Sequence, residues 1–143
     1  MTNCARMRKE VMRMSWSVDK TTMAVTMHKG DTGAYWMNLA TDSGNPFVSG
    51  DVAIYEVWRG NEMKIHREFD LQPETPTDID PGNGRFLIAF RNSDTDTWDT
   101  GSYDTEIRVS LNPIRADGSV VDGSTVRTIV KSTIQINAVL INI

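Results

Sequence analysis

The sequence has few of the residues on which disulfide scaffolds, metal sites and membrane spans depend. Its 143 residues include one cysteine, Cys4, and two histidines, His28 and His66. A single cysteine excludes an intrachain disulfide, which is typical of proteins from a reducing compartment. No apolar run approaches the ~20 residues that a transmembrane helix needs. The basic N-terminus is not followed by the apolar segment of a secretory signal.

The chain also has fewer basic residues than acidic ones. The chain carries 15 Lys and Arg against 19 Asp and Glu, which gives a formal net charge of −4. Nucleic acids and anionic membrane surfaces are bound by basic faces, because both present dense negative charge. We therefore expect neither a nucleic-acid partner nor a membrane partner.

What the chain does have is alternation of apolar and polar residues. The clearest run is 103–111, where every second residue from Tyr103 to Leu111 is apolar or Thr and the residues between are polar. Period two is the mark of a half-buried β-strand, and turn residues separate the runs at intervals of about 8 to 12 residues. Similar strand runs occupy 23–28, 35–40, 52–58, 62–69, 85–91 and 126–143. The pattern predicts an all-β, Ig-like antiparallel β-sandwich of about seven strands, with a small barrel as the alternative.

Two of these runs carry specific expectations about orientation. In 62–69, Met63, Ile65 and Phe69 are expected to face the core, and the side chains expected to face solvent are Lys64, His66 and Glu68. The run 52–58 is apolar on both faces, which indicates either a central strand or a bulge that switches faces midway.

The chain divides into two parts. Residues 1–15 contain four basic side chains and are expected to form a flexible basic segment. Residues 16–143 are expected to form one β-sandwich domain, since a chain of this size buries a single core.

No catalytic or metal-binding constellation has a recognisable spacing. Both histidines fall on the polar side of predicted strands, without a second ligand at metal-site spacing. One loop is acidic and carries Asp94, Asp96, Asp99 and Asp104. It lacks the glycine and terminal glutamate of an EF-hand loop, so surface turns are the better interpretation. General acid–base catalysis needs convergent titratable groups, and we therefore expect no enzymatic activity, no cofactor and no metal site.

Three tryptophans are candidate ligand-stacking residues. Exposed aromatic rings can stack against sugars, and Trp36, Trp58 and Trp98 are the side chains on which such a site would be built. The alternative is that they pack under loops or in a subunit contact.

The apolar C-terminus is a candidate interface. An unpaired strand as apolar as this one promotes aggregation, so we expect it in a buried strand or in a contact between subunits. The candidate interface residues are Val139, Leu140, Ile141 and Ile143. A homo-oligomer is the partner that this segment favours.

The order of several short motifs resembles the N-terminal Ig-like domain of phage baseplate upper proteins and related prophage tail-fibre modules. The matching segments are MHKGDT (27–32), YWMNL (35–39), DSGNP (42–46), GDV (50–52), GSYDTEI (101–107), DGS (117–119) and TIV (128–130). They span about residues 22–137.

The resemblance implies a non-enzymatic β-sandwich that docks onto other tail or baseplate proteins, within a virion or, when encoded by a prophage, in the bacterial cytoplasm. The chain departs from this family in its Met-rich, basic N-terminal segment. The second functional hypothesis is a carbohydrate-binding module that uses the three tryptophans.

Overall fold

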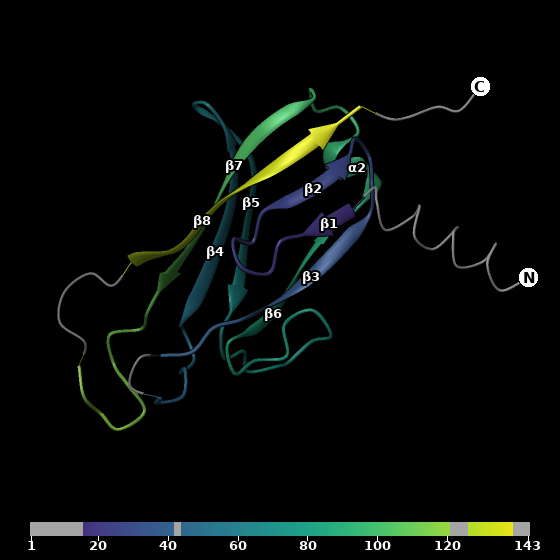
Figure 1. Ribbon diagram of the computed structural model, residues 1–143. Coiled ribbons are helices and arrows are strands. Elements are labelled where there is room, and N and C mark those ends of the chain that lie inside the picture. The colour runs from purple at the N-terminus through teal and green to yellow at the C-terminus, as the bar shows by residue number, and fades with distance from the viewer. Residues whose placement is uncertain (1–15, 42–43, 121–125, 139–143) are drawn as a thin grey trace, which may run out of the picture.

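The computed structural model describes residues 16–41, 44–120 and 126–138, where nearly all regular structure is β-strand (Figure 1). In order, the elements are β1 (Trp16–Val18), β2 (Val25–His28), β3 (Gly33–Asn38), β4 (Val52–Arg59), β5 (Glu62–Asp70), β6 (Arg85–Phe90), α2 (Asn92–Thr95), β7 (Gly101–Ser110) and β8 (Val126–Asn137). Two predictions lie outside the described residues: the flexible segment 1–15, and the interface at Val139, Leu140, Ile141 and Ile143.

The strands form two sheets. The larger has six strands in the order β1-β2-β8-β7-β4-β5, and the smaller pairs β3 with β6. All neighbours are antiparallel except β2 and β8, which run parallel. The order β8-β7-β4-β5 corresponds to the G-F-C-C′ order of a variable-type immunoglobulin sheet, with β3 and β6 in the places of B and E. The predicted Ig-like β-sandwich is confirmed.

The core lies between the two sheets. In β7, Tyr103, Thr105, Ile107 and Val109 are all buried, as the period-two pattern predicts. The small sheet contributes Met37, Phe86, Ile88 and Phe90, and the large sheet contributes Val25, Met27, Ala53, Tyr55, Val57, Phe69, Ile134 and Ile136. Because burial of apolar area is the main favourable term in folding, this layer holds the two sheets together.

A β-bulge corrects one predicted orientation. Val57 pairs with Ile65 while its neighbour Trp58 pairs with Met63, so Lys64 is an extra residue in β5. An extra residue reverses the alternation of faces beyond it. Met63 therefore lies on the outer face beside Trp58, with 46% of its surface exposed. The prediction that Met63 faces the core was wrong.

A second bulge lies between β7 and β8. Ile107 pairs with Val130 and Arg108 pairs with Thr128, which leaves Ile129 as the extra residue. Ile129 is 51% exposed although it is apolar and lies within a long strand. Regular alternation would also place Ile129 on the outer face, opposite Arg108, so the bulge takes it out of the ladder without changing its face.

One open side of the sandwich is closed by a charged residue that points inward. Arg67 in β5 pairs with the core-facing Tyr55, so its side chain starts on the inner face. Its guanidinium lies 5.4 Å from the centre of the Phe90 ring, donates to the carbonyl of Ala89 in β6, and is 3.1 Å from the carboxylate of Asp94. An inward charge at an edge strand discourages pairing with another chain.

Tyr103 anchors the connection that enters β7. Its hydroxyl donates a 2.6 Å hydrogen bond to the carbonyl of Asp99, four residues upstream. This arrangement matches the tyrosine corner of immunoglobulin-like domains. The hydroxyl of Tyr55, which is equally buried, makes no well-formed hydrogen bond among the described residues, and burial together with the neighbouring Tyr35 raises its pKa.

The two tyrosines should respond differently to removal of their hydroxyls. We expect Tyr103→Phe to lower the free energy of unfolding by about 1 kcal/mol, because it removes a satisfied, part-buried hydrogen bond. Tyr55→Phe should be neutral or stabilising, because an unsatisfied buried hydroxyl is costly. Urea denaturation of both variants checks this, and equal losses would contradict the structure.

Candidate functional site

The tryptophans proposed from the sequence lie in three different environments. Trp98 is only 6% exposed and stacks on the ring of Tyr103, with 4.7 Å between ring centres. It covers the tyrosine corner instead of facing solvent. The expectation that Trp98 offers an exposed platform is therefore wrong, because its loop folds back over the end of the core.

Trp36 is on the surface, but one face of its ring is already occupied. It lies on the outer face of the small sheet with 41% of its surface exposed. The guanidinium of Arg85 sits over the ring, 4.7 Å from its centre. A ligand that stacked on this face would first have to displace a cation–π contact.

Trp58 differs from the other tryptophans in the described part of the chain because no aromatic ring or guanidinium stacks on it. It is half-buried on the outer face of the six-stranded sheet, in β4. Its cross-strand neighbours are Met63 in β5 and Asp104 in β7. The bulge that turns Met63 outward therefore widens the apolar surface around Trp58.

A hollow of about 350 Å³ opens beside this ring. Its lining side chains on the outer face are Trp58, Asp104, Glu106 and Lys131, together with backbone at 60, 105 and 132. Glu106 pairs with Lys131 across β7 and β8, and Thr128 donates a 2.6 Å hydrogen bond to the Glu106 carboxylate. The volume is at the lower end of the range of small-molecule sites.

An ion network lies on the same sheet face. The carboxylate of Glu56 accepts from Arg108 at 2.8 Å and contacts His66 Nδ1 at 2.8 Å, while His66 Nε2 is 3.1 Å from Glu68. Burial alone would raise the pKa of Glu56, but the hydrogen bond with His66 and the charge of Arg108 outweigh it and lower that pKa. Hydrogen bonds that the imidazolium donates to the carboxylate of Glu56 and then of Glu68 raise the pKa of His66.

The sequence did not predict this network. Glu56 and His66 are ten residues apart and meet because β4 and β5 form a hairpin, while Arg108 arrives from β7. The only sequence signal was a charged residue in a run that is otherwise apolar on both faces.

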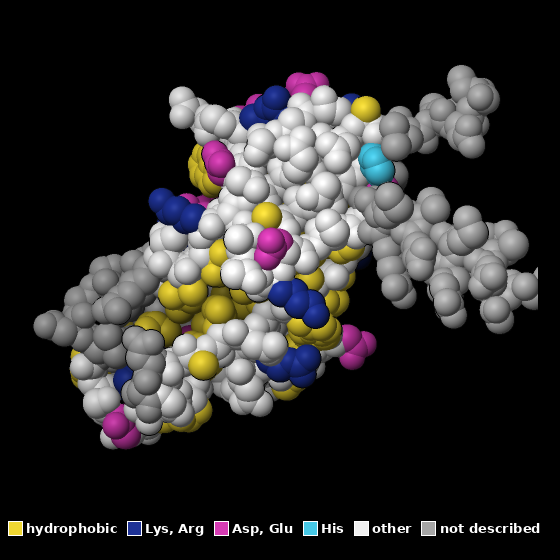
Figure 2. Space-filling view, in the orientation of Figure 1, with side chains coloured by type: hydrophobic (Ala, Val, Ile, Leu, Met, Phe, Trp, Pro, Cys, Tyr) yellow, Lys and Arg dark blue, Asp and Glu magenta, His cyan; other side chains and the backbone are white. Residues whose placement is uncertain are grey.

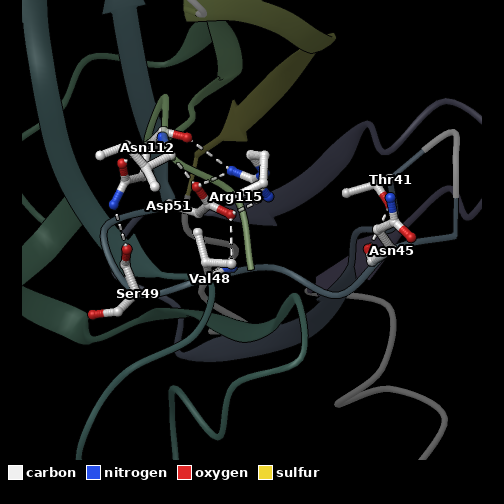
Figure 3. Close-up of polar contacts among 8 residues, drawn as sticks. Thr41, Asn45, Val48, Ser49, Asp51, Asn112 and Arg115 are labelled. Atoms are coloured by element: carbon white, nitrogen blue, oxygen red, sulfur yellow. Dashed lines mark hydrogen bonds and ion pairs between the residues drawn. The ribbon is translucent and has the colours of Figure 1, made fainter. Parts of the chain in front are cut away.

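A fully buried carboxylate lies at the other end of the sandwich (Figure 3). Asp51 binds both terminal nitrogens of Arg115, at 2.8 and 2.9 Å, and accepts from the backbone N–H groups of Val48 and Asn112. Asn112 in turn donates to the carbonyl of Ser49. Burial would raise the pKa of Asp51, but these donors outweigh it and lower it.

The Asp51 carboxylate joins two loops, and both of its oxygens are used by hydrogen bonds within the protein. A hollow of about 320 Å³ lies beside it, lined by Asn45, Pro46, Arg115, Ala116 and Asp117. The Arg115 guanidinium is bonded to Asp51 and to the carbonyl of Asn112, and Asp117 is bonded to Ser119. We therefore assign this cluster to stability.

The described residues include no group of three or more His, Cys, Asp or Glu side chains that could hold a metal ion. The acidic loop is used in local structure: Asp94 accepts from the backbone of Arg91 and pairs with Arg67. Within the same described ranges, no helix has the length and apolarity of a membrane span.

Comparison of the chain with protein-family models finds no match, and comparison with curated proteins and with solved structures likewise finds none. The functional argument therefore rests on the geometry of the two sheets and their surfaces.

The ion network predicts a pH-dependent contribution to stability. A histidine whose pKa is raised on folding contributes fully below its ordinary value of 6.5, and this contribution is lost as the pH rises through the folded-state value. We expect the difference in melting temperature between the wild type and His66→Gln to be largest near about pH 6 and to shrink toward about pH 8.

The control for this prediction is the same substitution in a Glu56→Gln background. Because Glu56 is the main cause of the shift, the pH-dependent part of the effect should be much smaller there. An identical pH dependence in both backgrounds would show that the contact is not formed.

The buried ion pair predicts a large loss of stability. Asp51→Asn removes the charge that compensates Arg115, and loss of one partner of a buried pair costs about 3–5 kcal/mol. The matched control is Glu62→Gln, which breaks the Glu62–Lys64 pair, where the glutamate is 69% exposed. We expect the control to cost less than about 1 kcal/mol. Urea denaturation near neutral pH compares them, and similar losses would contradict the assignment.

Proposed function

We propose that the protein is a non-enzymatic assembly module that binds other proteins by adding a strand at an open edge of its larger sheet. The observation that carries this proposal is the edge of β8. β2 pairs only with Ile134–Asn137, so residues 126–133 have no strand on the side away from β7 in the described part of the chain.

Such an edge presents backbone N–H and C=O groups to solvent and is a template for another strand. Backbone hydrogen bonds give affinity in this mode of recognition, and side-chain pockets give selectivity. Here the exposed Ile129 and the half-buried Val130 provide apolar contacts along the edge.

The surface next to this edge is apolar as well. Figure 2 shows hydrophobic side chains gathered between the positions of β8 and β3, where the two sheets separate. Here β8 of the larger sheet has no facing strand in the smaller sheet, which consists of β3 and β6 alone. A strand added beside β8 would cover apolar side chains of the core that the smaller sheet leaves accessible.

The motif order that resembles phage and prophage tail domains supports the same class of function. Domains of that family dock onto neighbouring tail or baseplate proteins and are not enzymes. We propose this setting for the protein, with other tail proteins or further copies of this chain as partners.

A charge on the open edge tests the proposal. We expect the wild type to self-associate, with a sedimentation coefficient that rises with concentration, and Ile129→Lys to shift it toward monomer, because a lysine on an edge strand opposes pairing. The matched control is Met63→Lys, an equally exposed apolar residue on the outer face. Monomeric wild type at all concentrations, without capture of a co-expressed tail protein, would overturn the proposal.

A second candidate function, carbohydrate binding, is favoured by one observation. Of the three tryptophans proposed from the sequence, Trp58 alone has a ring without a stacking partner in the described residues and lines a hollow.

A further inference from the structure

We infer that the hollow at Trp58 is a subsite for a neutral saccharide, with the indole as the stacking platform and with Asp104 and Lys131 as the hydrogen-bonding groups. The inference rests on the second candidate function. The hollow shares Lys131 with the open edge of β8, because Lys131 lies within residues 126–133. It names the ligand class and the residues of a site that the sequence alone did not distinguish from two others.

The first step of the argument is the position of the apolar strip. Trp58 and Met63 are cross-strand neighbours on β4 and β5, at the hairpin end of the sheet. Neither is covered by the small sheet, which packs on the opposite face. The C–H-rich face of a sugar ring packs against an aromatic surface of this kind, as apolar groups do on the face of an indole.

The second step is the polar groups beside the strip. Asp104 lies directly opposite Trp58 on β7, and Lys131 lies on β8 opposite Glu106. Neighbouring strands are about 4.8 Å apart and each residue rises about 3.4 Å, so the backbone of Asp104 is about 5 Å and that of Lys131 about 12 Å from that of Trp58. A sugar on Trp58 therefore lies beside carboxylate acceptors on β7, with the flexible ammonium of Lys131 on the far side of the hollow.

The third step is that Asp104 and Lys131 are not already engaged in polar contacts with other described residues. Glu56, His66 and Arg108 satisfy one another on the same face. Asp104 and Lys131 are exposed and make no hydrogen bond or ion pair within the described residues. A carboxylate accepts up to about four hydrogen bonds and an ammonium donates three, which matches the mixed donor and acceptor capacity of sugar hydroxyls.

Charge narrows the ligand class. The hollow contains two carboxylates, from Asp104 and Glu106, against the single ammonium of Lys131. Uronic and sialic acids would bring a further negative charge close to these carboxylates, and like charges at short range are unfavourable. Neutral hexoses and N-acetylhexosamines bring no charge, so they are the sugars that fit.

The test is a glycan array that presents neutral, uronic-acid and sialylated saccharides, followed by titration of the strongest binder with tryptophan fluorescence. We expect neutral saccharides to bind and acidic ones not to. Trp58→Ala should weaken binding about tenfold, since aromatic stacking and burial contribute about that factor. Trp58→Phe should retain part of the affinity, because it keeps an aromatic face.

Two further variants keep the test decisive if Trp58→Ala alters the fold. Asp104→Asn and Lys131→Ala change exposed side chains and should each weaken binding without changing the melting temperature. Trp36→Ala is the matched control and should leave binding unchanged.

Three results would overturn the inference: no saccharide bound by the array, binding that survives loss of Trp58, or binding of arginine-rich peptides in place of sugars. None of them affects the sedimentation behaviour on which the strand-addition proposal depends.

Discussion

The inner face of the six-stranded sheet buries its apolar side chains against a partner sheet of only two strands, β3 and β6. Two strands cannot cover six, so other parts of the chain have to complete the core. Trp16 lies against Phe90 at 5.8 Å and packs so closely on Gly33 that a Cβ there would fall 2.2 Å from the indole. Phe47, Leu71 and Trp98 are buried from loops. The difference in strand number between the sheets thus explains why loop side chains and Trp16 of the edge strand β1 complete the core.

The difference in strand number between the two sheets also places polar side chains at the open sides of the sandwich. Arg67 closes the side between β5 and β6 through contacts with Phe90, Ala89 and Asp94, and the Asp51–Arg115 pair holds two loops at one end. Such groups are stable at these positions because each has a charged or hydrogen-bonding partner. Among the described residues, no strand pairs with residues 126–133 of β8 on the side away from β7. This is the edge for which docking is proposed.

The outer face of the large sheet shows how a small change in backbone register creates a surface. One extra residue in β5 moves Met63 to the side of Trp58. Without that bulge Met63 would follow the regular alternation onto the inner face, and the apolar surface at Trp58 would not have its present form. Bulges often re-aim side chains at functional positions, and here one shapes the surface at Trp58 for which a binding role is proposed.

Local periodicity was enough to predict the sandwich and seven of the eight described strands, because alternate burial is recorded in successive residues; the short β1 was not predicted. It also placed His66 on the polar side of its strand. It could not predict contacts that depend on residues far apart in the chain, such as Asp51 with Arg115. The apolar faces of 52–58 indicated a central strand or a bulge: β4 is a central strand, and the extra residues lie instead in β5 and β8. The sequence could not predict those positions, since one additional residue changes the register without changing local composition.

The choice among the tryptophans belongs to the tertiary structure for the same reason. By itself the sequence determined a two-sheet β-domain with aromatic residues near its strands and turns. Only the packing decided that Trp98 is covered, that Trp36 carries Arg85 and that Trp58 lines a hollow. Exposure of a side chain is a property of its neighbours in space, and those neighbours come from strands that the chain brings together only when it folds.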